Sequence, residues 1–308
     1  MNGAPVTAGV RLVMGGILGL LVVASAVTWW LTRRGPAPKY AELAARVKSW
    51  WVMVAVFTIA IAIDTRLSIA FFGFVSFLAL KEYFSLIPTR RADRRVLFWA
   101  YLSIPFQYYW VYRGWYGMFI VFIPVWMVML ISARMVLIGD TRDFLRAVGT
   151  IQWGMIVMVF SISHQAYLLV LRPNGGAALV LFLVALTQLN DVAQYIWGKT
   201  LGRHKVVPTV SPNKTVEGLI GGLLTTTALA MLLAPVLTPL SFNHSIAVGL
   251  MIGAGGFLGD ITIGAVKRDI GVKDAGTMLP GHGGVLDRVN SLTYTAPLFF
   301  HFLRFYYQ

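Results

Sequence analysis

The sequence contains no cysteine and very little charge. The absence of cysteine from the 308 residues excludes disulfides, thiolate metal sites and cysteine nucleophiles, and it leaves the redox compartment open. Only 12% of the residues are charged and 57% are apolar, whereas a soluble domain averages about a quarter charged residues. This composition is typical of an integral membrane protein, and we expect an all-α bundle of transmembrane helices.

Internal repeats of about 20–50 residues, low-complexity tracts and long polar stretches are also missing. We therefore expect a single membrane domain over residues 1–308. Its polar residues divide it into two parts. Residues 1–176 keep them at helix ends and form a helical scaffold, whereas residues 177–308 place them within or just beyond the helices and form the expected catalytic part.

Apolar runs are abundant, and roughly 20 apolar residues suffice to cross the hydrocarbon core. The first run lacks the small-residue cleavage site of a signal peptide, so we treat it as a membrane helix. Only Asp64, Thr65 and Arg66 separate the second and third runs, which form either a tight hairpin or one long bent helix, so nine crossings is the alternative count. The ten predicted helices lie near residues 10–32, 48–64, 66–82, 95–112, 115–133, 148–171, 177–197, 218–239, 245–263 and 290–306.

The connections between these runs alternate between basic and nearly neutral. The five basic connections are residues 33–48, 81–95, 134–146, 197–217 and 267–288, and they hold most of the formal net charge of +14. Because cytoplasmic loops carry the excess of lysine and arginine, both termini should lie outside the cytoplasm. The basic face would also attract anionic lipids and nucleotides, although topology alone accounts for the first two connections. No soluble basic domain is present to hold a nucleic acid.

A polar segment joins the seventh and eighth predicted helices. Asp191 closes an apolar helix, where a carboxylate costs roughly 2.5–3.5 kcal/mol and usually has a partner or a task. Ser211 before Pro212 could cap the next helix, with Lys214 and Thr215 in its first turn. A hydroxyl, an ammonium and free backbone N–H groups at a positive helix end suit a phosphate. An ordinary helix start explains the same residues equally well.

The ninth predicted helix ends in glycines and an acid. Gly255 and Gly259 have the GxxxG spacing that lets helices pack closely. Asp260 follows on the basic side of the membrane, seven residues before Lys267 and Arg268. An ion pair with either cation is the alternative to a functional role for this carboxylate.

Charge and glycine also gather in residues 273–290. Glycines on both sides of His282 let backbone amides approach a ligand, although a lone histidine is more often a structural hydrogen-bonding residue. A helix should begin near Val285, and on it Asp287 and Asn290 would project from one face and reach a single metal ion. Such oxygen ligands suit magnesium, whereas Asp287 could instead complement the helix dipole. The glycines are Gly281, Gly283 and Gly284.

Serine nucleophile elbows, HExxH zinc sites and dinucleotide fingerprints are absent from the sequence. The remaining inventory indicates the handling of phosphates with a divalent cation at the membrane surface. Such chemistry needs charge neutralisation and alignment more than covalent catalysis.

These motifs closely resemble the signature of the phosphatidate cytidylyltransferase (CDP-diacylglycerol synthase) family over roughly residues 187–292. The resemblance implies an integral membrane enzyme that condenses CTP with phosphatidate, with magnesium, to give CDP-diacylglycerol and pyrophosphate. The matching residues are Lys267-Arg268, Lys273-Asp274, Pro280 to Gly284, Leu286 to Arg288, Ser211 to Gly218 and Gly259-Asp260.

The resemblance implies a bacterial inner membrane protein whose active site faces the cytoplasm, and it also implies roles for individual residues. The expected metal ligands are Asp260, Asp287 and Asn290, for one magnesium ion with a second cation left open. The expected catalytic residues are Lys267, Arg268, Lys273, His282 and Arg288. The expected substrate-binding residues are Ser211, Asn213, Lys214, Thr215, Glu217, Asp191, Gly283 and Gly284. The expected partners are CTP, an anionic lipid phosphate and membrane lipids, without nucleic acid and with a homodimer left open.

The sequence departs from the family pattern at a few positions, which suggests a divergent branch. Asn290 stands where the family usually carries aspartate, so the site loses one negative charge and should hold its metal less tightly. Ile263 and Gly264 replace an acidic residue and a serine. Three alternatives stay open: another lipid acceptor, use of CTP as a phosphate donor to a lipid alcohol, and a non-catalytic lipid-binding or transport protein.

Overall fold

The computed structural model describes residues 7–34, 37–90, 93–172, 175–276, 278 and 283–308. In these ranges the regular secondary structure is helical, and Lys205 and Thr215 form an isolated antiparallel bridge. The predicted all-α fold is confirmed.

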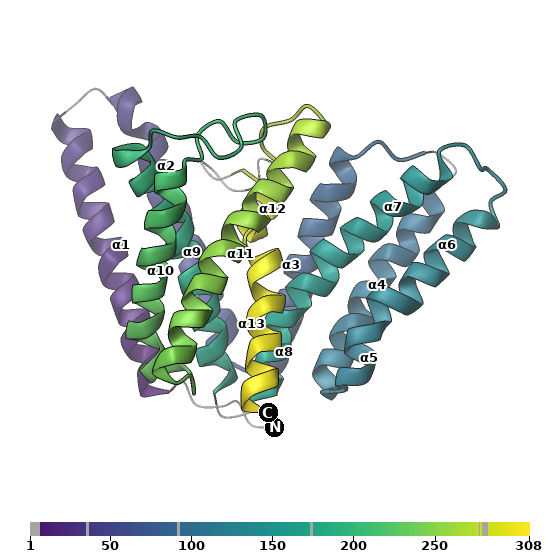
Figure 1. Ribbon diagram of the computed structural model, residues 1–308, viewed down its shortest axis with the longest axis horizontal. Helices are drawn as coiled ribbons and strands as arrows, with labels where there is room; N and C mark the ends of the chain where they lie inside the picture. Colours follow the sequence, from purple (N-terminus) through teal and green to yellow (C-terminus); the bar gives the residue numbers. More distant parts are fainter. Residues whose placement is uncertain (1–6, 35–36, 91–92, 173–174, 277, 279–282) are drawn as a thin grey trace.

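Successive helices run in alternating directions between the two ends of the molecule (Figure 1). Each of the ten predicted helices has a counterpart, and two of these counterparts contain π-helical segments, η2 and η3. The described elements are α1 (Ala8–Arg34), α2 (Ala37–Ala62), α3 (Thr65–Leu86), α4 (Arg94–Arg113), α5 (Tyr116–Val121), η2 (Phe122–Met127), α6 (Val128–Val136), α7 (Phe144–Gly154), η3 (Met155–Ser161), α8 (Ile162–Leu171), α9 (Gly176–Leu201), α10 (Val216–Leu237), α11 (Phe242–Asp269), α12 (Val285–Val289) and α13 (Leu292–Tyr307).

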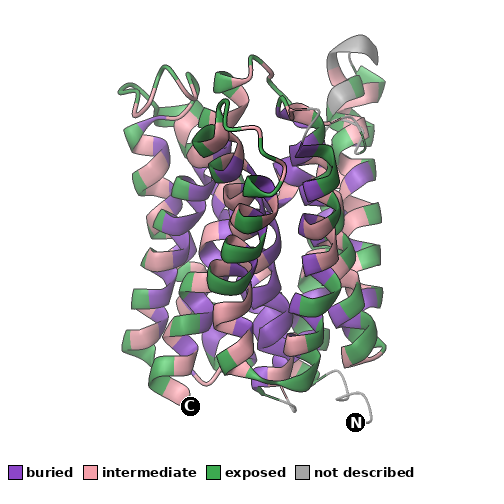
Figure 2. Ribbon diagram, turned by 90° about the vertical axis from the view of Figure 1, so that its right-hand side faces the viewer, coloured by how far each residue is buried: buried purple, intermediate pink, exposed green. Residues whose placement is uncertain are grey.

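Within the described ranges, eight helical runs are long and apolar enough to cross a membrane. They include α1, α3 and α9, and residues 116–136 and 144–171 each count as one run. Buried residues fill the interior of the bundle, and exposed residues lie along its outside (Figure 2). Many exposed side chains are large and apolar, such as Leu12 and Leu20, as expected for a surface in contact with lipid. The protein is therefore an integral membrane protein. The count of ten crossings stays a prediction, because α4 and α13 are not among the eight runs.

The second and third helices form a tight hairpin. α2 ends at Ala62 and α3 begins at Thr65. Asp64 is the N-cap of α3, and its carboxylate accepts a hydrogen bond from the Arg66 backbone N–H at 3.0 Å. Of the two arrangements that the sequence left open, the hairpin is the one observed.

The basic connections lie at one end of the bundle. In Figure 1 the C-terminal ends of α1, α3, α6, α9 and α11 are all at the top, and the start of α1 and the end of α13 are at the bottom. This arrangement agrees with the alternation of charge in the sequence. Which end faces the cytoplasm stays a prediction.

Two helices extend further than their hydropathy predicts. α9 continues to Leu201 and α11 to Asp269, beyond the predicted ends at residues 197 and 263. Asp191 and Asp260 therefore lie within helices, and the prediction that each closes one was wrong. The reason is that hydropathy marks where an apolar segment ends, whereas α11 stops only just before Gly271, which has a positive φ of 74°.

Asn190 connects three helices within residues 177–308. Its side chain is fully buried, its Nδ2 donates to the Gly253 carbonyl at 3.3 Å, and its Oδ1 accepts from the Thr226 hydroxyl at 3.0 Å. These bonds join α9 to α11 and α10. At Gly256 a Cβ would lie 2.9 Å from Asn190 Nδ2, so the absence of a side chain there permits the approach.

Replacing Asn190 with alanine should destabilise the fold by about 1–3 kcal/mol, because it leaves a buried hydroxyl and a buried carbonyl without this partner. Thermal unfolding of the detergent-solubilised protein measures the effect. Thr200→Ala, on an exposed turn of α9, is the control and should unfold like the parent. Equal unfolding temperatures for Asn190→Ala and the parent would contradict the structural role.

Candidate active site

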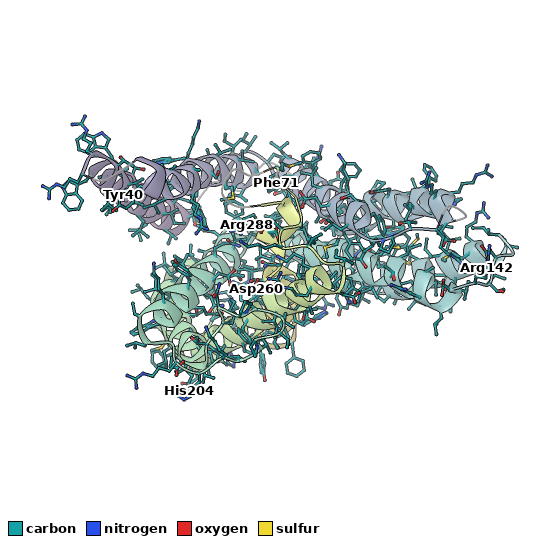
Figure 3. The ribbon with its side chains drawn as sticks, turned by 90° about the horizontal axis from the view of Figure 1, so that it is seen from above. Tyr40, Phe71, Arg142, His204, Asp260 and Arg288 are labelled. Atoms are coloured by element: carbon teal, nitrogen blue, oxygen red, sulfur yellow. The ribbon has the colours of Figure 1, made fainter. Side chains whose placement is uncertain are left out.

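A cavity of about 530 Å³ opens near the end of the bundle that carries the basic connections. It lies between α9, α11, α12 and the loop that precedes α10. Seen from that end, Asp260 and Arg288 are close to the centre of the molecule, whereas His204 is at an edge (Figure 3). The cavity brings together eight of the predicted site residues, namely Asp191, Ser211, Asn213, Lys214, Asp260, Asp287, Arg288 and Asn290.

Asp260 connects three segments of the cavity wall. Its Oδ2 pairs with Lys214 Nζ at 2.7 Å, and its Oδ1 accepts from Asn290 Nδ2 at 2.6 Å. Gly259 allows this contact, because a Cβ there would lie 2.6 Å from the Asn290 carbonyl. The predicted role of the glycine pair in close packing is confirmed. The alternative that Asp260 pairs with Lys267 or Arg268 was wrong, since its partner comes from the loop before α10.

Asp287 lies at the start of α12, which begins at Val285 as predicted. Its Oδ1 pairs with Lys267 Nζ at 2.7 Å. Its Oδ2 accepts from the backbone N–H groups of Ala275 and Gly284 at 2.8 and 3.0 Å. Asp287 thus both lines the cavity and satisfies backbone donors at a helix start, which agrees with the helix-terminus interpretation, and its role as a metal ligand stays a prediction.

Asp191 is the third carboxylate of the cavity. Both of its oxygens accept from the hydroxyl of Ser291, at 3.1 and 2.9 Å. One turn earlier on α9, Gln188 Nε2 donates to the Arg288 carbonyl at 3.2 Å. α9 therefore supports the segment that carries Asp287 and Arg288.

Arg288 brings an unsatisfied donor to the cavity. Its buried Nε has no hydrogen-bond partner among the described residues. Burial lowers the pKa of the guanidinium from its ordinary value, while the carboxylates of Asp287, Asp191 and Asp260 oppose that shift. A guanidinium keeps its charge under such conditions, and its planar fork matches the oxygens of a phosphate.

The loop before α10 differs from its prediction. The N-cap is Thr215, whose hydroxyl accepts from the Gly218 N–H at 3.1 Å, so the cap expected at Ser211 was wrong, as was the placement of Lys214 in the first turn. The reason is that the bridge between Lys205 and Thr215 closes the loop immediately before the helix. Ser211 and Lys214 line the cavity from this loop.

Several predicted site residues are not among the described residues that line the cavity. Lys267 reaches it through Asp287, and Arg268 is exposed and donates to the Val210 carbonyl at 3.1 Å. Glu217 accepts from the backbone N–H groups of Arg203 and His204, which shapes the loop. The others are Thr215, Gly283 and Gly284, which support the backbone, Lys273, which is exposed, and His282 and Gly281, which lie outside the described residues.

The donor set is compatible with magnesium. Among the described residues no three Asp, Glu or His side chains form a ready metal cluster. Magnesium does not need one, because it commonly binds one or two carboxylates together with substrate phosphates. Asp191, Asp260, Asp287 and the amide of Asn290 offer oxygen ligands in one cavity. A magnesium ion at these residues stays a prediction.

Other cavity residues were not among the predicted site residues. They lie on the face of α9 that carries Asp191 or in the following loop, and helical spacing from Asp191 was the signal that could have found those on α9. They are Gln188, Gln194, Tyr195, Gly198, Lys199 and Lys205.

Comparison with known proteins shows the family of this chain. A sequence model of the cytidylyltransferase family matches residues 44–306. The uncharacterized protein YnbB of Escherichia coli (strain K12) is 45% identical over 94% of this chain and 96% of its own length. The phosphatidate cytidylyltransferases of Staphylococcus saprophyticus and Staphylococcus haemolyticus are 40% identical over 131 residues, which is 41% of this chain and about half of theirs, at 48%. Because the family match covers most of the sequence, this chain belongs to the cytidylyltransferase family.

Proposed function

We propose that this protein transfers the cytidylyl group of CTP to phosphatidate or a similar lipid phosphate, forming CDP-diacylglycerol and pyrophosphate. Membership of the cytidylyltransferase family supports the use of CTP. The two staphylococcal relatives are named phosphatidate cytidylyltransferases, which supports phosphatidate as the acceptor over the part of the chain that they share.

One observation carries the proposal. Three carboxylates, the ammonium of Lys214 and the guanidinium of Arg288, whose Nε has no partner among the described residues, line a single cavity at the basic end of the bundle. Lys199 and Lys205 add positive charge to the same cavity. Carboxylates for a divalent cation and cations for phosphates are the two needs of nucleotidyl transfer.

The reaction requires little covalent help from the protein. An oxygen of the lipid phosphate attacks the α-phosphorus of CTP, and the bond between that phosphorus and the oxygen bridging to the β-phosphate breaks, so pyrophosphate leaves. Because the attacking oxygen is already ionised near neutral pH, no strong general base is needed. Arg288 and Lys214 would bind phosphate oxygens and align the two substrates. Magnesium, when bound at the carboxylates, would neutralise charge on the triphosphate.

The location of the cavity suits these two substrates. It lies at the end of the bundle with the basic connections, which the positive-inside rule assigns to the cytoplasm. CTP would enter from the cytoplasm, and the headgroup of the lipid would lie in the adjacent leaflet. The apolar helices would hold the acyl chains in the membrane.

The test is to give the purified protein radiolabelled CTP, magnesium and a panel of lipid phosphates and lipid alcohols, and to identify the products. We expect a labelled CDP-lipid and one pyrophosphate for each product molecule, strongest with phosphatidate. Release of CDP with a phosphorylated lipid would replace this function by a kinase. No turnover of any lipid, with CTP still bound, would support a non-catalytic protein. Asp260→Ala is the matched inactive control.

A further inference from the structure

Glu82, in the part of the chain without recognisable motifs, contacts the segment that carries Asp287 and Arg288. It lies near the end of α3, which packs against α12. Its Oε1 accepts from the Val285 backbone N–H at 3.0 Å, and its Oε2 accepts from the Leu286 backbone N–H at 2.7 Å. One carboxylate thus binds the first two residues of α12 across about 200 positions of sequence.

The segment is shaped around this carboxylate. At Gly284 a side chain would overlap the Glu82 carboxylate, and at Gly276 a Cβ would lie 3.1 Å from Glu82 Oε1. Both glycines therefore leave room for a charged group that comes from another helix. Glycine in this segment can let a substrate approach the backbone. Room for the Glu82 carboxylate is a second, physically distinct explanation.

Two carboxylates accept hydrogen bonds from the backbone N–H groups of this turn. Asp287 takes the N–H groups of Ala275 and Gly284, and Glu82 takes those of Val285 and Leu286. Asp287 belongs to α12 and moves with it, whereas Glu82 belongs to a long helix of the bundle. Asp287 pairs with Lys267 of α11, and Glu82 adds a second connection, from α3 to the backbone of α12.

We propose that Glu82 is a positioning residue that holds α12 so that Asp287 and Arg288 face the cavity. The proposal rests on the proposed function for its activity readout. It also gives the scaffold part of the chain a direct role in the site. A displacement of about 1 Å at reacting groups can cost roughly 100-fold in rate. The hydrogen bonds to Glu82 should therefore affect the rate even though Glu82 touches no substrate.

The first test is steady-state kinetics of Glu82→Ala and Glu82→Gln. We expect kcat to fall by about 10- to 100-fold in Glu82→Ala, with the KM for CTP changed less than about threefold, because alignment is lost while binding groups remain. Glu82→Gln keeps one acceptor oxygen and should lie between that variant and the parent. Ser85→Ala, one turn further along α3 and exposed, should behave like the parent. Unchanged kcat in both Glu82 variants would overturn the proposal.

A double-variant cycle separates positioning from general destabilisation. If Glu82 acts through α12, adding Glu82→Ala to Arg288→Lys should lower kcat by clearly less than the product of the two single losses. A loss equal to that product would mean that Glu82 acts elsewhere, and the proposal would fail.

Hydrogen exchange gives a readout that needs no activity. The backbone amides of Val285 and Leu286 should exchange at least about tenfold faster in Glu82→Ala than in the parent, because they lose their acceptors. Unchanged exchange would overturn the positioning role even if the enzyme makes CDP-lipid. Faster exchange in a protein that makes no product would leave the role standing and remove the proposed function instead.

Discussion

Replacing Asp287 with alanine should lower CDP-lipid formation by at least about 100-fold while the protein stays folded in detergent. The carboxylate lines the cavity and binds Lys267 and two backbone N–H groups. Its loss would remove a proposed anionic ligand of the magnesium ion. It also leaves the ammonium of Lys267, only 16% exposed, without this partner, and that ammonium can turn toward the space that the substrate phosphates need.

A second replacement separates the charge of Asp287 from its hydrogen bonds. Asp287→Asn keeps an acceptor oxygen for the N–H groups of Ala275 and Gly284 but loses the negative charge. If the negative charge of Asp287 binds the magnesium ion, Asp287→Ala and Asp287→Asn should lose activity to the same extent. If Asp287 only orders the turn, Asp287→Asn should stay active.

Product formation from labelled CTP measures both variants, and circular dichroism in detergent checks the fold. Asp269→Ala is the control, because it removes an exposed acid from the last turn of α11. Full activity in Asp287→Ala would remove this residue from the site.

The sequence predicted the helices well because each needs only local information. Apolar runs and their polar ends located ten helices, and the alternation of charge placed the five basic connections at the same end of the bundle. Helix ends were predicted less well, since α11 carries Lys267 and Arg268 on a helical extension that hydropathy cannot detect. Favourable charge at a helix C-terminus was the signal that could have extended it.

The sequence predicted which residues line the cavity better than it predicted which side chains pair with one another. Motif residues from α9, α11 and α12 line one cavity, as the sequence suggested. The partners of the acids were not predictable, because Lys214 and Asp260 are 46 positions apart and meet only when α10 and α11 pack together. Glu82 was beyond reach for the same reason, since a single glutamate near the end of an apolar helix has no pattern of its own.

Asn290→Asp should make the stability of the protein depend on magnesium. In the parent, Asn290 Nδ2 donates to Asp260 Oδ1 at 2.6 Å. An aspartate at this position would bring two carboxylate oxygens to a similar distance, and like charges that close require a proton or a cation between them. Lys214 is already paired with the other oxygen of Asp260, so it cannot neutralise both acids fully.

We therefore expect Asn290→Asp to unfold at a lower temperature than the parent in EDTA and to recover on addition of magnesium. Its magnesium titration midpoint should fall by about tenfold, which corresponds to roughly 1.4 kcal/mol of added cation binding. Thermal unfolding in detergent across a magnesium series measures both effects without depending on catalysis. Asn213→Asp is the matched control, because it adds the same charge to the same cavity from the loop. Should the titrations of Asn290→Asp and the parent coincide, position 290 is not a metal ligand, and the cation must bind through Asp260 and its other neighbours.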